Sequence, residues 1–330
     1  MREEGGYTPR VTVIIPTYNE ADAIEERLNN IYSQDYPREK LEIIVVDSAS
    51  ADGTPAVVEK WAEQHLDIKV LLIREEQRRG KANALNHALR YATGEVVAIA
   101  DADALWAPEA LRRAVAKLAD PTVGAVSCVK RPLNGRGIEE GYRGFYNQLR
   151  VAESKLWSTP IFHGELAAFR REALEAVGGF PTDIGADDSY TATQIALRGL
   201  RAIVADDVLC TEAVPRRDYH AWRIRRAQHL IQHFAKAIRR LHKAPPPFRG
   251  VLAAEAYLHV VNPWLLAGAV AALAASAAAG SLPALAILAL GAALLAYKPY
   301  RVWTAAQAYL ITAAVKNLWT KELIWKKQKK

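Results

Sequence analysis

The chain has 330 residues, of which 51% are apolar and 24% carry a charge. This balance excludes a disordered, collagen-like or disulfide-stapled chain and leaves room for one large or two ordinary domains. Its two cysteines, Cys128 and Cys210, lack the spacing of a metal site, and a reducing compartment is the simplest interpretation. So few cysteines and a single methionine point to a hot environment.

Charge divides the chain into unlike parts. Residues 1–215 carry 25 basic and 33 acidic side chains, whereas residues 216–330 carry 18 basic and 3 acidic ones. Such a contrast indicates different tasks. We expect a globular domain over 1–215, a basic amphipathic segment over 216–248 and a membrane domain over 249–330. The long apolar run after the basic segment favours a membrane over nucleic acid as the partner, and the charged opening residues differ from a secretory signal.

Short apolar runs alternate with amphipathic segments through the first part of the chain. We expect buried strands at 11–15, 41–46, 68–73 and 96–100, and helices at 21–34, 54–65, 80–91 and 108–118. This alternation predicts an α/β fold in which helices cover both faces of a parallel sheet. Ligands of such sheets bind beyond the carboxyl ends of the strands, so we expect the functional residues there.

Residues 216–243 combine a basic face with an apolar face. The apolar residues recur at helical spacing and are Ala227, Leu230, Ile231, Phe234, Ile238 and Leu241. The pattern predicts a helix that lies in a membrane interface. The alternative is an ordinary surface helix that packs on the globular domain.

Three nearly uncharged stretches follow, at 251–279, 282–297 and 302–319. Within the first two, the apolar runs Pro263–Ala279 and Leu282–Ala296 are each near the lower end of the roughly 17–25 residues that cross a bilayer, and together they predict a transmembrane hairpin. The third is bracketed by Trp303 and Trp319, which suit an aromatic belt at each interface, and we expect a third span there. The alternatives are a terminal interfacial helix for the third stretch and a buried alanine-rich hairpin for the first two.

Aspartates directly follow two of the expected strands. Asp47 ends the second strand, and Asp101, with Asp103 two residues later, ends the fourth. Two carboxylates at this spacing can hold one Mg²⁺ or Mn²⁺ ion when a diphosphate and water supply the other ligands. No G-x-G-x-x-G sequence follows a strand, so a dinucleotide fingerprint is absent. The pattern therefore predicts a metal–diphosphate site at the rim of the sheet.

Six motifs occur in a fixed order along the chain. They are PTYNE at 16–20, LEIIVVDSASADGT at 41–54, RRGKANALN at 78–86, VVAIADAD at 96–103, AFRREAL at 168–174 and GGFPTDIGADD at 178–188. With this order the chain resembles the family 2 membrane glycosyltransferases of GT-A fold, which include cellulose synthase and the polyprenyl-phosphate sugar synthases. The resemblance implies a hexosyltransferase whose catalytic domain is a Rossmann-like, nucleotide-binding GT-A domain.

The resemblance also implies which residues hold the donor. The nucleotide base and ribose are assigned to Pro16, Tyr18, Glu20 and Asp47, and Lys81 is placed beside the nucleotide. A divalent metal on the diphosphate is assigned to Asp101 and Asp103, with Asp103 as the likelier direct ligand. His220 is a candidate third metal ligand, and its alternative is a plain surface residue of the basic helix.

The catalytic base of the family is an Asp in an E-D motif. Here Ala186 replaces the Glu and two aspartates follow; alignment through GGF favours Asp187 as the base, with Asp188 as its rival. The family's Q-x-x-R-W motif is incomplete, but Arg226 stands at its expected position and is assigned to the pyrophosphate, which needs only a positive group.

These assignments imply a membrane-bound, metal-dependent, inverting transferase. We expect one sugar, mannose from GDP-mannose with UDP-glucose as the next candidate, to move to a dolichyl- or polyprenyl-phosphate-linked acceptor in N-glycan or glycolipid biosynthesis. The chain would be an integral protein of the cell membrane with its catalytic domain in the cytoplasm. A processive UDP-sugar polysaccharide synthase is the alternative, and a nucleotidyltransferase and a non-catalytic scaffold are weaker ones.

Overall fold

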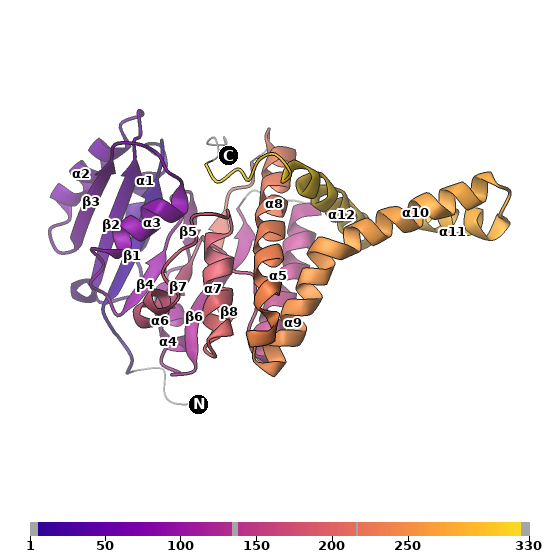
Figure 1. Cartoon of the computed structure of the whole chain (residues 1–330). Coiled ribbons are helices and arrows are strands. Elements are labelled where there is room, and N and C mark those ends of the chain that lie inside the picture. Colours follow the sequence, from indigo (N-terminus) through magenta and orange to yellow (C-terminus); the bar gives the residue numbers. More distant parts are fainter. Residues whose placement is uncertain (1–5, 134–137, 216, 325–330) are drawn as a thin grey trace.

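The computed structural model describes residues 6–133, 138–215 and 217–324 (Figure 1). The described strands form one eight-stranded sheet in the order β3-β2-β1-β4-β7-β6-β8-β5. The strands are β1 (Val11–Thr17), β2 (Leu41–Ser48), β3 (Lys69–Glu75), β4 (Val96–Ile99), β5 (Ala104–Trp106), β6 (Val123–Pro132), β7 (Ala167–Arg170) and β8 (Arg201–Glu212).

The first half of the sheet is parallel, as the sequence predicts, and the second half is mixed. β1 pairs in parallel with β2 and β4, and β2 with β3. β7 runs antiparallel to β4 and β6, and β5 runs antiparallel to β8. The four strands expected from the sequence, now β1 to β4, are thus parallel as predicted, and the antiparallel pairs involve β5 and β7, which were not expected from the sequence.

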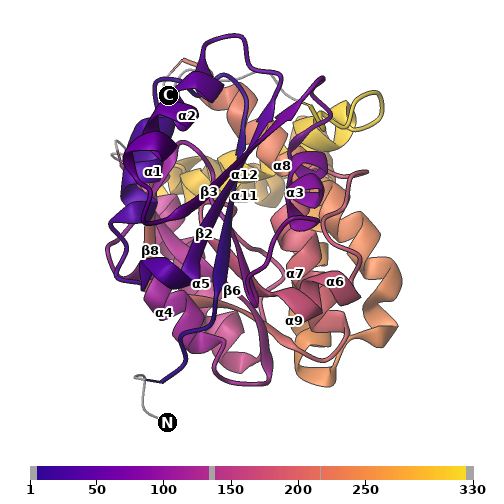
Figure 2. The same cartoon turned by 90° about the vertical axis from the view of Figure 1, so that its left-hand side faces the viewer.

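Helices cover both faces of the sheet (Figure 2). Helices α1 (Ile24–Tyr32), α2 (Thr54–Gln64) and α4 (Ala110–Lys117) pack on one face; α3 (Lys81–Leu89), α6 (Arg171–Ala176) and α7 (Asp187–Leu197) pack on the other. Alternate residues of each strand serve the two cores: Val13 and Ile15 join the first, and Ile14 joins the second.

The remaining described helices wrap the far side of the sheet and extend away from it. They are α5 (Ile138–Leu156), α8 (Tyr219–Ala237), the 3₁₀ segment η2 (Ile238–Lys243), α9 (Pro246–Ala256), the π-helical turn η3 (Tyr257–Val261), α10 (Asn262–Ala278), α11 (Leu282–Leu294) and α12 (Lys298–Lys316). A 3₁₀ turn, η1 (Arg38–Lys40), leads into β2.

The basic amphipathic segment folds onto the protein itself. The apolar side chains Leu230 and Phe234 of α8 join the core on the α3 face of the sheet. On another side of α8, Ala227 and Ile231 pack against Leu310 of α12. The protein core and α12 therefore cover most of the apolar face that was expected to lie in a membrane interface, while Ile238 stays exposed.

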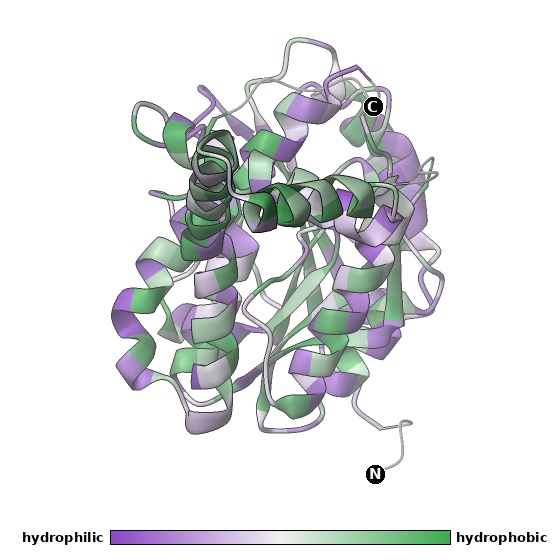
Figure 3. Cartoon of the chain, turned by 90° about the vertical axis from the view of Figure 1, so that its right-hand side faces the viewer, coloured by the Kyte–Doolittle hydropathy of each residue, from purple (hydrophilic) through white to green (hydrophobic). Residues whose placement is uncertain are grey.

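The helices α10 and α11 form a hairpin that projects from the body of the molecule (Figure 1), and its surface is almost uniformly apolar (Figure 3). Leu265, Leu285 and Leu290 are each more than half exposed. A hairpin buried in the core is therefore excluded. Among the described helices, the continuous run Pro246–Ala278 is long and apolar enough to cross a membrane.

The stretch expected as a third span is the helix α12, which meets α11 at an angle of 105°. The described part of the chain contains a second candidate span only if α11 and α12, with the bend between them, are counted as one span. The helix α12 packs along α8 of the protein body. The third span expected over residues 302–319 and its alternative, a terminal interfacial helix, both stay predictions.

A disulfide joins Cys128 of β6 to Cys210 of β8 across 82 residues of chain. Both side chains are buried. A register irregularity between the paired strands sets Cys128 opposite Ala205 but its neighbour Val129 opposite Leu209. The composition had suggested that both cysteines are reduced, and the structure corrects this. The sequence alone does not show that these two distant strands become neighbours.

Candidate active site

The loops after β1 and β2 interlock at the rim of the sheet. Asn19, in a left-handed conformation with φ 56°, donates its backbone N–H to the Ser50 hydroxyl at 2.8 Å. Its side-chain oxygen accepts from the Ala51 backbone N–H at 2.8 Å. Asp47 is buried and accepts from the Ser50 backbone N–H at 3.0 Å and from the Thr17 hydroxyl at 3.3 Å. In this structure Asp47 therefore shapes the loop, and its contact with a nucleotide stays a prediction.

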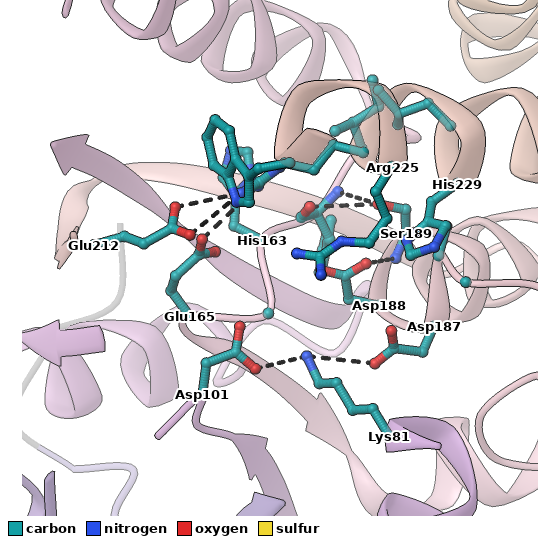
Figure 4. A pocket seen from close by; sticks show the side chains of 18 of the residues that line it. Lys81, Asp101, His163, Glu165, Asp187, Asp188, Ser189, Glu212, Arg225 and His229 are labelled. Carbon is teal, nitrogen blue, oxygen red and sulfur yellow. Dashed lines mark hydrogen bonds and ion pairs between the residues drawn. The ribbon is translucent and has the colours of Figure 1, made fainter. Parts of the chain in front are cut away.

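The side chain of Lys81 points between Asp101 and Asp187 (Figure 4). Lys81 is the first residue of α3 and follows Gly80, whose φ of 97° requires glycine. The Lys81 ammonium lies 2.6 Å from an Asp101 oxygen and 3.6 Å from an Asp187 oxygen. Burial opposes the charge of Lys81, but the carboxylates of Asp101, Asp187 and Asp188 outweigh that effect and raise its pKa.

The D-x-D pair has the donor chemistry of a divalent-ion site. Asp101 and Asp103 both line the cavity directly beyond β4, and both offer hard carboxylate oxygens. The buried side chain of Arg27 stacks on Trp106, with 4.4 Å between the guanidinium carbon and the ring centroid. Burial lowers the pKa of Arg27 to about 9, although Asp101 and Asp103 favour its charge. Sequence reasoning missed Arg27, which reads as an ordinary polar position of α1.

His220 lies away from these carboxylates. It is exposed on α8, and its Nδ1 lies 2.6 Å from the Tyr309 hydroxyl of α12. No group of three His, Cys, Asp or Glu side chains within the described ranges is arranged to hold a metal. The role of His220 as a third metal ligand therefore stays a prediction beside its alternative, a surface residue of the basic helix.

Asp187 and Asp188 begin α7 and line the cavity. An Asp188 oxygen accepts the Ser189 backbone N–H at 2.6 Å. Burial and the neighbouring Asp187 carboxylate raise the pKa of Asp188 to about 7. Burial also raises the pKa of Asp187, although Lys81 counteracts this. A carboxylate that titrates near neutral pH suits general base catalysis.

A second charged cluster lies beside the first and was not found from the sequence. Glu165 and Glu212 are buried and hold three cations. The Lys130 ammonium lies 2.9 Å from Glu165; an Arg143 nitrogen lies 3.1 Å from Glu212; Arg226 lies 3.3 Å from Glu212. The predicted partner of Arg226, a pyrophosphate, is untested, and in this structure its guanidinium pairs with carboxylates. The strands, loop and helices that carry these residues give no local signal that they converge.

The charged groups around Lys81 and those of the second cluster line one cavity of about 360 Å³, whereas Arg27, Asp47 and His220 are not among its lining residues. Of the predicted site residues, those that line it are Pro16, Tyr18, Glu20, Lys81, Asp101, Asp103, Asp187, Asp188 and Arg226. Arg78, from the loop before α3, stacks on Tyr18 with 3.8 Å between its guanidinium carbon and the ring centroid. The lining residues also include Arg150 of α5, His259 of η3, which continues into α10 of the hairpin, and Tyr309 of α12, which follows the hairpin.

Two family models match the chain. The model described as glycosyl transferase family 2 covers residues 12–178, and that described as glycosyl transferase family group 2 covers residues 96–314. The chain belongs to glycosyl transferase family 2. It is a glycosyltransferase with a GT-A fold, as its mixed sheet and strand-end site also indicate.

Known glycosyltransferases of several kinds are similar to it. The structure of a mannosyltransferase from Pyrobaculum calidifontis, in complex with GDP-Man and Mn²⁺, is 70% identical, with a TM-score of 0.88, and the match covers 95% of this chain and 88% of that one. Glycosyltransferase AglE of Haloferax volcanii is 30% identical over 63% of this chain and 68% of its own length. A beta-monoglucosyldiacylglycerol synthase of Synechocystis is 31% identical over 54% of this chain, which spans only 39% of that protein.

Proposed function

We propose that this glycosyltransferase transfers mannose from GDP-mannose with the help of Mn²⁺ or Mg²⁺. The observation that carries the proposal is the 70% identity, over 95% of the chain, to a mannosyltransferase that binds GDP-Man and Mn²⁺. The cavity supports it, because the predicted donor residues Pro16, Tyr18 and Lys81 face the same space as the D-x-D pair.

The residues at the end of β4 fit a divalent ion. Asp101 and Asp103 would hold it, with phosphate and water oxygens as further ligands. When bound, the ion offsets the negative charge that develops on the leaving diphosphate. The stacked pair of Tyr18 and Arg78 forms one wall of the same cavity and offers a planar surface and a cation to the nucleotide.

We propose that Asp188 is the base. Its carboxylate takes the proton of an acceptor hydroxyl as the hydroxyl oxygen bonds to the anomeric carbon and the carbon–diphosphate bond breaks. Attack from the face opposite the diphosphate inverts the anomeric centre and gives a β-linked product from an α-linked donor. The pKa of Asp188, which is raised to about 7, supports this role. Asp187 is less suited to it, because it lies nearer to Lys81, whose positive charge counteracts the rise in its pKa.

The acceptor is proposed to carry a lipid tail and a phosphate. The cavity is also lined by Arg150, Arg223 and Arg226 and by the helices α8 and α12, while the run Pro246–Ala278 leads from the catalytic domain into the exposed hairpin. This arrangement favours an integral membrane protein with the domains 1–215, 216–248 and 249–330, working on the cytoplasmic face.

The test is transfer of label from a panel of nucleotide sugars into the lipid phase, with detergent-solubilised protein, Mn²⁺ and dolichyl phosphate or a dolichyl-linked glycan. We expect GDP-mannose to be the preferred donor and EDTA to abolish transfer. Loss of transfer in Asp188→Asn with the glycan acceptor, but retention with dolichyl phosphate, would identify a hydroxyl nucleophile for the former, because a phosphate oxygen is already ionised. Preference for a UDP-sugar, or a polymeric product, would refute the proposal.

A further inference from the structure

The ammonium group of Lys81 lies where a positive charge is unfavourable unless nearby negative charges stabilise it. It begins α3, where the helix dipole disfavours positive charge, and the first turn of that helix carries no acidic residue. Two carboxylates from other elements compensate it: Asp101 from the end of β4 at 2.6 Å and Asp187 from the start of α7 at 3.6 Å. The side chain of Lys81 is only 15% exposed.

The backbone around this ammonium is shaped to admit it. A Cβ atom on Gly164 would lie 2.6 Å from the Lys81 ammonium nitrogen and 3.3 Å from oxygens of both Asp101 and Asp188. No side chain fits at Gly164 while the ammonium stands there. The ammonium is therefore enclosed by Asp101, Asp187 and the bare backbone of Gly164.

The Asp101 carboxylate thus has a cation in contact before any donor binds. A divalent ion that takes Asp101 as a ligand would bring two positive charges close to the ammonium, and the repulsion opposes its entry. A nucleoside diphosphate changes this balance, because its oxygens offer ligands to the ion and a new anionic partner to the ammonium.

We propose that Lys81 is the resident counter-cation of the donor-free enzyme, which competes with the divalent ion for Asp101 until a nucleoside diphosphate enters. This inference rests on the proposed metal dependence. It makes the binding of ion and nucleotide cooperative, so each raises the affinity of the other by the same factor. The ion then enters together with the donor, and its affinity without nucleotide is low.

The experiment measures Mn²⁺ binding by the loss of the free-ion signal in electron paramagnetic resonance, with and without GDP. For the unaltered protein we expect GDP to raise Mn²⁺ affinity at least tenfold. In Lys81→Met we expect Mn²⁺ to bind at least tenfold more tightly than to the unaltered protein when GDP is absent, and the effect of GDP to shrink. Arg79→Met is the matched control: it removes one charge from the adjacent, exposed residue, and Mn²⁺ affinity should change less than threefold.

Several outcomes would overturn the inference. If the unaltered protein bound Mn²⁺ equally tightly with and without GDP, the inference would be overturned. This measurement needs no variant, so it remains decisive if Lys81→Met fails to fold. Unchanged or weaker Mn²⁺ binding by a folded Lys81→Met, or an equal gain in Arg79→Met, would do so as well. Absence of Mn²⁺ binding even with GDP would refute the proposed metal together with this inference. The assay contains no sugar and no acceptor, so an error in the proposed sugar or acceptor would not affect its result.

Discussion

The two aspartates at the start of α7 can be distinguished by their effects on the pH dependence of transfer to a hydroxyl acceptor. If Asp188 is the base, its pKa of about 7 means that roughly a tenth of the enzyme is active at pH 6 and nine tenths at pH 8. We expect kcat/KM, which reports the free enzyme, to rise about tenfold over this interval. Asp188→Asn should lower kcat/KM by about a hundredfold or more and remove the acidic limb.

Asp187→Asn should act in a different way. The Asp187 charge is, after burial, the largest influence that raises the pKa of Asp188. Its neutralisation lowers that pKa, so the acidic limb should move to lower pH while the plateau rate falls less than in Asp188→Asn. The measurement is initial velocity at low donor concentration from pH 5.5 to 8.5, with far-ultraviolet circular dichroism to confirm folding. A dead Asp187→Asn beside an active Asp188→Asn would refute the assignment and return the base to Asp187.

Other parts of the structure give further expected outcomes. Asp103→Ala should abolish transfer, and Mn²⁺ should no longer protect the GDP-bound variant against heat. Unchanged transfer would exclude Asp103 as a metal ligand. Gly164→Ala should lower kcat/KM at least tenfold with little change in melting temperature, because its methyl group displaces the end of a flexible lysine rather than backbone; a normal rate would show that the ammonium's position is unimportant. Removal of the disulfide in Cys128→Ala/Cys210→Ala should reduce the free energy of unfolding by about 2–4 kcal/mol, as seen in denaturant titrations, and reductant should affect only the unaltered protein. Leu290→Glu, on the exposed surface of the hairpin, should reduce flotation with liposomes without a change in melting temperature of the detergent-solubilised protein.

The sequence predicted those parts of the site that depend on local order. Asp101 and Asp103 follow β4 directly, and the rule that ligands bind at carboxyl ends of strands places them in the cavity with Lys81. Asp187 and Asp188 could be located through the family resemblance, by alignment through the GGF sequence, and the structure places them at the start of a helix. In each case the residue lies within a few positions of a recognisable strand or helix end.

The parts that it did not predict depend on contacts between distant segments. Lys130, Glu165 and Glu212 come from three separate elements and meet only because β6 pairs with both β7 and β8. The basic helix α8 has the composition of an interfacial helix, but α12 covers it from 80 and more residues away in the chain. Amphipathicity shows that a helix has a face to bury and not what buries it.

One continuous helical run fixes the hairpin relative to the cavity. Its first part belongs to the catalytic domain, since Phe248 and Leu252 of α9 are fully buried in the core on the α3 face of the sheet. Glu255, near the end of α9, lies 2.7 Å from an Arg150 nitrogen, and Arg150 lines the cavity. This buried ion pair sets orientation more than stability. A hairpin held by lipid would therefore hold the cavity at a defined height above the bilayer, which the proposed lipid-linked acceptor requires if its phosphate is to meet the donor site while its tail stays in the membrane.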